Sequence, residues 1–254
     1  MTIILFLTFI VLLIIGVPVA VSLGLAAVVT LFLGTDVPLV AGIQSICVDS
    51  FPLMAIPFFV LAGNIMTAGG ISKRLVSFAS MIVGRITGGL ANVSIFASAI
   101  FAAISGSSPP TTAAIGGVMM PEMNKRHYDK YFTGATVAAA GTIGMVIPPS
   151  IPMILYAVLA GVSVSDMFIA GILPGLLLVF SMGIVAYTYA KKNNIPRDNT
   201  KYSFKDVTNV LSSNLWALLM PIIILGGIYL GLLAPTEAAA VAVFLWSSCR
   251  FIDI

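Results

Sequence analysis

Residues 105–112 read Ser-Gly-Ser-Ser-Pro-Pro-Thr-Thr, and this stretch interrupts an otherwise apolar segment. Proline has no backbone N–H, and inside a helix its ring clashes with the carbonyl group of the preceding turn. Two consecutive prolines therefore indicate a helix boundary, and they suit the first turn of a new helix, where N–H groups have no helical partner. The stretch predicts two helices joined by a short irregular tip.

The segment 131–160 contains a second interruption, Gly-Met-Val-Ile-Pro-Pro-Ser-Ile-Pro, at residues 144–152. As one continuous helix the segment would be about 45 Å long, against about 30 Å of hydrocarbon in a bilayer. Its prolines are too closely spaced for an undisturbed helix. We therefore expect a discontinuous helix with its gap near the middle of a membrane.

The composition predicts a membrane protein. The 254 residues are 59% hydrophobic and 8% charged, with a mean hydropathy of +1.12, whereas soluble proteins carry about 25% charged residues. The apolar content excludes a disordered chain, and Cys47 and Cys249 are too few for a disulfide scaffold. The formal net charge of +3 is too small and scattered to indicate a nucleic-acid partner. The length allows about six to eight membrane spans, so we predict an all-α, polytopic helical bundle.

The basic residues predict which loops face the cytoplasm, because short loops rich in lysine and arginine stay on that side. They form three clusters and one late residue: Lys73, Arg74 and Arg85; Lys125, Arg126 and Lys130; Lys191, Lys192, Arg197, Lys201 and Lys205; and Arg250. The breaks at 36–52, 161–166 and 231–236 contain no basic residue and are predicted outside. Segments 71–83 and 203–213 alternate apolar and polar residues, as amphipathic helices at the inner surface do.

This topology requires the chain to reverse direction between Arg85 and Lys125, since both lie inside. The second arm, residues 111–124, would cover only about 21 Å as a helix, less than a full crossing. We therefore predict a re-entrant helical hairpin with its tip inside the membrane. A complete two-helix hairpin with an outer loop stays open as an alternative. Near the N-terminus, residues 3–33 form either one kinked helix or two short helices, because Gly16-Val17-Pro18 interrupts them.

The two interruptions also predict a cation site. Irregular polar backbone at membrane depth is tolerated where it is buried in protein or lines a wet cavity. In broken membrane helices, unwound carbonyl groups and helix C-termini coordinate sodium. Hydroxyl and carbonyl oxygens of the two interruptions would form such a site where they meet. A purely structural role of the prolines and hydroxyls in packing is the alternative.

A hydrolase that pairs Ser107 or Ser108 with His127 is a poorer hypothesis, because His127 is predicted in a basic surface loop away from the hairpin tip. No nucleotide fingerprint, phosphate loop or serine-nucleophile motif is present. We therefore predict no enzymatic activity, no catalytic residue and no organic cofactor.

Five motifs occur in order along the chain, and together they resemble one family. They are Gly-Val-Pro-Val-Ala (16–20), Ile-Pro-Phe-Phe-Val-Leu-Ala-Gly-Asn (56–64), Ser-Gly-Ser-Ser-Pro-Pro-Thr-Thr-Ala (105–113), Gly-Met-Val-Ile-Pro-Pro-Ser (144–150) and Pro-Thr-Glu-Ala-Ala-Ala (235–240). The chain resembles the N-terminal portion of the large membrane (permease) subunit of tripartite ATP-independent periplasmic (TRAP) transporters.

The resemblance implies a sodium-coupled secondary transporter of elevator type in the bacterial inner membrane. It would import organic acids, of the dicarboxylate or sialic-acid class, delivered by a periplasmic binding protein, and a small membrane subunit would be its second partner. The family's sodium site, carried over to this chain, places the ion, Na⁺, among six residues of the two interruptions: Ser105, Ser107, Ser108, Gly144, Val146 and Pro149.

The resemblance also implies a division of the chain into four parts. Residues 1–70 would be N-terminal scaffold helices, 71–87 an interfacial amphipathic helix, and 88–190 a transport region with the hairpin and the broken helix. Residues 191–254 would hold a second interfacial helix and the start of a second repeat. Members of the family are longer, so a truncated product is expected here, and a transport-inactive fragment that acts only as a membrane assembly module is the alternative function.

Overall fold

A computed structural model of the chain describes residues 2–34, 51–195 and 218–252. The chain divides into two compact units, Met1–Phe51 and Pro52–Ile254. Their regular structure is helical, and the described ranges contain no strand, which confirms the predicted all-helical class. The amphipathic helix predicted at 203–213 lies outside the described residues, and the four-part functional division stays a prediction.

The first unit consists of helices α1 (Thr2–Ile14) and α2 (Val19–Gly34), which pack against each other. Between them the backbone of Gly16 is left-handed (φ +87°), a conformation that side chains other than glycine rarely adopt. Of the two alternatives for this segment, the two short helices are therefore the observed one. Ile3 and Ile14, at the two ends of α1, are 79% and 80% exposed, as on a helix that faces lipid or a partner.

The second unit begins with α4 (Ala55–Ala68) and α5 (Ile71–Val83), whose axes meet at 78°. Gly70 makes this bend possible with a left-handed backbone (φ +71°). Ile71 and Leu75 of α5 are buried, whereas Lys73 is exposed. The predicted amphipathic helix is thus confirmed with one apolar and one basic face.

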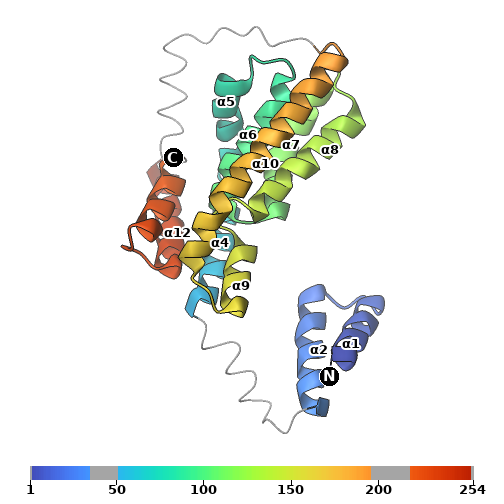
Figure 1. Cartoon of the computed structure of the whole chain (residues 1–254), viewed down its shortest axis with the longest axis vertical. Helices are drawn as coiled ribbons and strands as arrows, with labels where there is room; N and C mark the ends of the chain where they lie inside the picture. The colour runs from blue at the N-terminus through green and yellow to red at the C-terminus, as the bar shows by residue number, and fades with distance from the viewer. Residues whose placement is uncertain (1, 35–50, 196–217, 253–254) are drawn as a thin grey trace. The chain divides into compact units, whose positions relative to one another are not determined.

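Helix α6 (Gly89–Ser105) is the central helix of the second unit (Figure 1). It packs against α5 and against three helices that follow it: α7 (Ser108–Lys125), α8 (Lys130–Thr142) and α10 (Val164–Lys192). Buried residues occur along the whole of α6, from Gly89 to Ser105, and many of them are Gly, Ala or Ser. Small residues let neighbouring backbones approach closely, which is how membrane helices pack without a hydrophobic driving force.

Three further helices complete the described part of the second unit: α9 (Ile151–Ala160) between α8 and α10 in the chain, a helix at Leu218–Tyr229, and α12 (Pro235–Ile252), which packs along α4. The carboxylate of Glu237 accepts a hydrogen bond of 2.8 Å from the backbone N–H of Ala234. The acidic side chain therefore satisfies a free donor at the N-terminal end of α12, where the helix dipole also favours negative charge.

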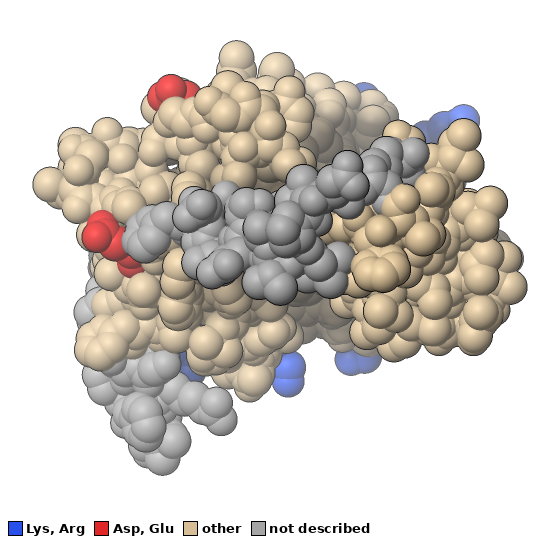
Figure 2. Space-filling model, turned by 90° about the horizontal axis from the view of Figure 1, so that it is seen from below, with Lys and Arg blue, Asp and Glu red and all other residues tan. Residues whose placement is uncertain are grey.

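Helix α10 has the properties of a membrane span. Among the described residues it is the one unbroken helix long and apolar enough to cross a bilayer, and α4 with α5 would be a second span if the bent pair is counted as one. Leu173 and Phe180 on α10 are 67% and 70% exposed. Residues other than Asp, Glu, Lys and Arg make up nearly all of the described surface seen from below (Figure 2). This surface suits a lipid environment better than water.

The N-terminus of α8 gives a direct test of local stability. The carboxylate of Asp129 accepts hydrogen bonds of 2.9 Å from the backbone N–H groups of Tyr131 and Phe132. Asp129→Ala removes both and should destabilise the protein by about 1 kcal/mol, the usual cost of losing an N-cap. In thermal unfolding of the purified protein the midpoint should fall by about 2–4 °C. Asp129→Asn keeps an acceptor oxygen and serves as the control, for which we expect a smaller fall in the midpoint. An unchanged midpoint for Asp129→Ala would contradict the capping role.

Candidate cation site at the hairpin tip

The tip of the α6–α7 hairpin consists of Gly106 and Ser107. Gly106 ends α6 with a left-handed backbone (φ 60°), and its N–H donates to the carbonyl of Ala102 at 2.9 Å. Ser107 is extended (φ −144°, ψ 142°), and α7 begins at Ser108 with prolines in its first turn. The predicted helix–tip–helix arrangement is confirmed, and the prolines lie where a missing N–H has the least cost.

The predicted discontinuous helix is also observed. Helix α8 ends at Thr142, a 3-10 turn covers Ile143–Met145, and α9 begins at Ile151. The residues between them are held by local bonds, including one of 2.7 Å from the Ser150 hydroxyl to the carbonyl of Met145. The peptide bond between Pro148 and Pro149 is cis. The chain thus leaves helical hydrogen bonding for several residues while it remains inside the folded unit.

The two interruptions lie against each other. The backbone N–H of Ile151 donates to the carbonyl of Gly106 at 2.9 Å. A Cβ placed on Gly106 would lie 2.6 Å from the carbonyl oxygen of Pro149, and one placed on Gly144 would lie 2.6 Å from the carbonyl oxygen of Ser107. Glycine is therefore required on both sides of the contact, because any side chain would push the two backbones apart.

Three oxygens converge just inside the tip. The hydroxyl of Thr111 donates to the carbonyl of Ser107 at 2.7 Å, and the hydroxyls of Ser105 and Thr111 are 2.8 Å apart. Ser105 is 2% exposed and Thr111 is fully buried. The Ser105 hydroxyl also lies 3.4 Å from the carbonyl of Ser107, so either hydroxyl can donate in the bond between Ser105 and Thr111. Each hydroxyl oxygen has two lone pairs, so the hydroxyls of Ser105 and Thr111 keep acceptor capacity for a cation.

The structure brings four of the six predicted residues to this contact. Ser105 and Ser107 lie on the tip side, and Gly144 and Pro149 lie on the side of the broken helix. Two predicted residues make other contacts. The carbonyl of Ser108 accepts the hydroxyl of Thr112 at 3.0 Å within α7, and the carbonyl of Val146 lies 2.9 Å from the position of a Cβ on Gly171 in α10.

Thr111 is the residue at this contact that is not among the six predicted from the sequence. Its hydroxyl reaches the carbonyl of Ser107, four residues earlier, in the back-bonding pattern that serine and threonine use inside helices. That spacing was readable from the sequence. The role of Gly171 was not, because it depends on how α10 packs against the broken helix.

The donor set fits a monovalent cation. Hydroxyl and carbonyl oxygens are neutral, hard ligands, and sites of this kind bind sodium in broken membrane helices. Calcium sites in proteins draw on carboxylates, whereas the described part of the chain contains no group of three or more acidic, His or Cys side chains arranged for a metal ion. Ser105, Ser107 and Thr111 are the residues that would hold the ion on the hairpin side.

The alternative Ser–His pairing is not supported by the geometry. His127 follows the C-terminal end of α7, where it is exposed, while Ser107 and Ser108 lie at the start of that helix. The helix has 18 residues, which at 1.5 Å per residue makes it about 27 Å long. A proton cannot pass directly between groups separated by this length, because general-base catalysis requires hydrogen-bond reach.

Comparison with known proteins adds independent information. Residues 6–248 match the sequence model of a family described as the tripartite ATP-independent periplasmic transporter, DctM component. The chain is 46% identical over 234 residues to the isethionate TRAP transporter permease protein DctMQ of Oleidesulfovibrio alaskensis, which covers 91% of this chain and 37% of that protein.

Two further relatives carry different substrate names. The identity is 42% over 241 residues to the C4-dicarboxylate TRAP transporter large permease protein DctM of Vibrio cholerae, covering 94% of this chain and 53% of the relative. The identity is 40% over 194 residues to the sialic acid TRAP transporter permease protein SiaT of Haemophilus influenzae, covering 76% of this chain and 31% of that relative. The chain thus spans about half or less of the length of these relatives.

Proposed function

Because the chain belongs to the DctM component family of tripartite ATP-independent periplasmic transporters, we propose that it is a membrane subunit of a sodium-coupled importer of organic acids. The substrate class is the dicarboxylates or the sialic acids, which are named in two of its relatives. The observation that carries the sodium coupling is the cluster of Ser105, Ser107 and Thr111 oxygens at the contact between the two helix interruptions, in which Ser105 and Thr111 are buried.

The depth of this cluster supports an ion site inside the membrane. Helix α8 has 13 residues, so the helix interruption lies about 20 Å from Lys130 at its basic end. With Lys130 at the cytoplasmic surface, that distance falls within the roughly 30 Å of hydrocarbon. The hairpin that meets the interruption is then re-entrant, with its tip enclosed by protein at membrane depth, where unwound backbone is tolerated.

The helix dipoles at the contact support coupling of an anion to a cation. Helices α7 and α9 begin there, at Ser108 and Ile151, and α6 ends there at Ser105. Helix N-termini favour negative charge and C-termini favour positive charge. Prolines in the first turns of α7 and α9 remove N–H donors. The helix dipoles would therefore contribute more to the attraction of an organic acid than direct hydrogen bonds would. A bound sodium ion would add attraction for the same anion.

The partners and the location follow from the same family. A small membrane subunit and a periplasmic binding protein would complete the system, and the subunit would cross the bacterial inner membrane several times. The region 88–190 would carry the ion between the two sides in an elevator movement against the N-terminal scaffold. Sodium and substrate would each strengthen the binding of the other, because coupling between two sites is reciprocal.

Uptake into proteoliposomes tests the proposal. The subunit is reconstituted with its small membrane subunit, the binding protein is loaded with labelled dicarboxylate or sialic acid, and an inward sodium gradient is imposed. We expect uptake that falls by at least about tenfold when potassium replaces sodium at equal ionic strength, since the gradient supplies the driving force.

Three outcomes have distinct meanings. Uptake that persists without sodium contradicts ion coupling. Uptake of neither substrate with sodium and both partners present, for a subunit that still binds its small partner, favours the assembly module. Sodium-dependent uptake of one acid and not the other identifies the substrate class.

A further inference from the structure

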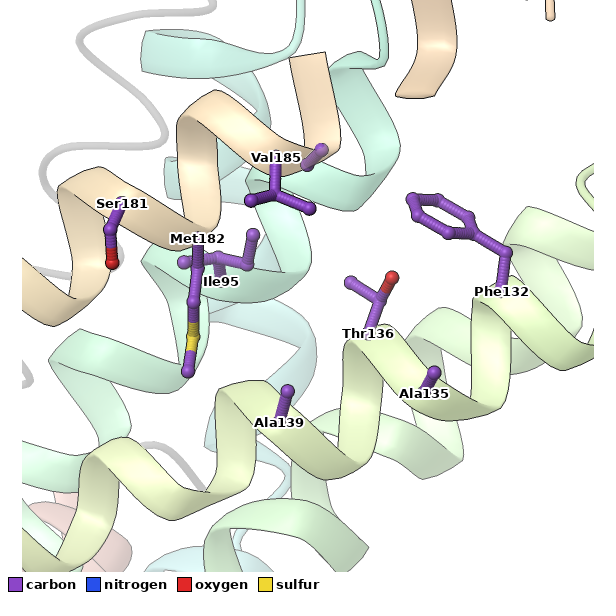
Figure 3. A pocket seen from close by; sticks show the side chains of 9 residues that line it. Ile95, Phe132, Ala135, Thr136, Ala139, Ser181, Met182 and Val185 are labelled. Atoms are coloured by element: carbon purple, nitrogen blue, oxygen red, sulfur yellow. The ribbon is translucent and has the colours of Figure 1, made fainter. Parts of the chain in front are cut away.

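A groove of about 320 Å³ runs between α8 and α10 on the surface of the second unit (Figure 3). Its walls are almost entirely apolar, with Ala135 and Ala139 on α8, Met182 and Val185 on α10, and Ile95 of α6 between them. Two polar side chains, Thr136 and Ser181, line it, and the Ser181 hydroxyl donates to the carbonyl of Leu178 in its own helix at 3.0 Å. The groove therefore suits a hydrocarbon chain.

An aromatic stack joins the two helices at one end of the groove. The rings of Phe132 and Tyr189 lie parallel, with centroids 3.6 Å apart, and the ring of Tyr128 stacks with that of Phe132 at 6.4 Å. Phe132 is in the first turn of α8 and Tyr189 is in the last turn of α10. The stack therefore fixes the basic end of α8 beside the basic end of α10.

Three lysines lie just beyond the stack. Lys130 opens α8, Lys191 and Lys192 close α10, and all three are exposed. The two acidic side chains of this region have other partners. The carboxylate of Asp129 caps α8 and accepts two backbone hydrogen bonds, and that of Glu122 pairs with Lys125 at 3.7 Å. An anionic group that entered at this end would meet ammonium groups on both helices.

We propose that the groove binds an anionic phospholipid of the cytoplasmic leaflet, with one acyl chain along α8 and α10 and its phosphate at Lys130, Lys191 and Lys192. Basic pockets between membrane helices on the cytoplasmic side are suited to anionic lipid headgroups. From Ser181 to Lys191 the helix rises about 15 Å, which is half of the roughly 30 Å hydrocarbon thickness and hence the depth of one leaflet. Charge and length therefore both match a single lipid, whereas a free phosphate would leave the apolar groove unused.

The inference rests on the cytoplasmic side assigned to the basic clusters and is independent of sodium binding. Its test is retention of lipid by the purified protein in native mass spectrometry, with palmitoyl-oleoyl phosphatidylglycerol or phosphatidylcholine added at equal concentration. We expect one phosphatidylglycerol per chain and at least about tenfold weaker retention of phosphatidylcholine, because each lysine near the headgroup contributes attraction for an anionic lipid.

Matched variants separate the headgroup from the chain. Lys130→Gln combined with Lys191→Gln and Lys192→Gln should reduce phosphatidylglycerol retention by at least about tenfold, whereas Lys73→Gln on α5 should not change it. Ala139→Leu fills the groove and should reduce retention severalfold, while the neighbouring Ala138→Leu, outside the groove lining, should retain the lipid. All these positions are exposed, so the variants are expected to fold, and circular dichroism checks this.

Several results would overturn the proposal. The proposal fails if the two lipids are retained equally, or if the triple lysine variant retains phosphatidylglycerol as the wild type does. It also fails if Ala139→Leu retains as much lipid as Ala138→Leu. Competition by glycerophosphoglycerol, which has the headgroup without chains, at the same concentration as the lipid would show that the groove holds no acyl chain. Loss of the lipid on addition of the small membrane subunit would assign the groove to a protein interface. Sodium-dependent uptake can succeed or fail independently of each of these results.

Discussion

Gly144→Ala should lower sodium-dependent uptake by at least about tenfold, because the substitution separates the two halves of the candidate site. The new Cβ would lie 2.6 Å from the carbonyl oxygen of Ser107, 2.8 Å from its carbonyl carbon and 3.0 Å from the Thr111 hydroxyl. Two of these atoms belong to the backbone, so no side-chain rotation relieves the overlap. Overpacking of this kind costs about 1–3 kcal/mol, and the whole hairpin tip must move to accommodate it.

Gly134→Ala is the matched control for this experiment. Gly134 is in the same helix, α8, and a Cβ placed on it would meet nothing within 4 Å. Its uptake should equal that of the wild type. Initial rates are measured for both variants in proteoliposomes at equal protein content, after gel filtration has shown that each is monodisperse. Wild-type uptake and wild-type sodium dependence in Gly144→Ala would contradict the close contact between tip and interruption.

Combined replacement Ser105→Ala and Thr111→Val should raise the sodium concentration for half-maximal uptake by about tenfold or more. Valine has nearly the shape of threonine, so the substitution removes a hydroxyl and leaves the carbonyl of Ser107 without its 2.7 Å donor. The loss of a buried hydrogen-bonding partner costs about 1–3 kcal/mol. More importantly for function, two of the three convergent oxygens disappear, and the ion would have to be held by the carbonyl and by water.

The shape of the sodium titration distinguishes an ion site from a packing role. If the hydroxyls bind the ion, the half-saturating sodium concentration rises while the rate at saturating sodium is largely kept. If they serve only packing, the maximal rate falls and the half-saturating concentration stays constant, which would falsify the assignment of the ion to this cluster. Thr142→Val is the control, because the hydroxyl of Thr142 is exposed and bonds only within its own helix, to the carbonyl of Ala139 at 2.7 Å.

Much of the helix arrangement was predictable from local chemistry. The amphipathic helix at Ile71–Val83, the end of one helix at Ser105 and the interruption before Ile151 all lie where glycine, proline and charge indicated them. The number of helices near the N-terminus was not predictable, because Gly16 and Pro18 are compatible both with one kinked helix and with two separate helices. The packing of α1 against α2 decides between them.

The sequence by itself determined the helical membrane class and the places where the helices stop. These depend on properties that each residue carries everywhere, such as the missing N–H of proline and the low charge of the chain. The tertiary structure decided which oxygens meet. The carbonyl of Val146 lies against Gly171 of α10, whereas the hydroxyl of Thr111 lies at the contact. The direction of a carbonyl group outside a helix is not set by the local sequence. It depends on the helix that packs against that part of the chain.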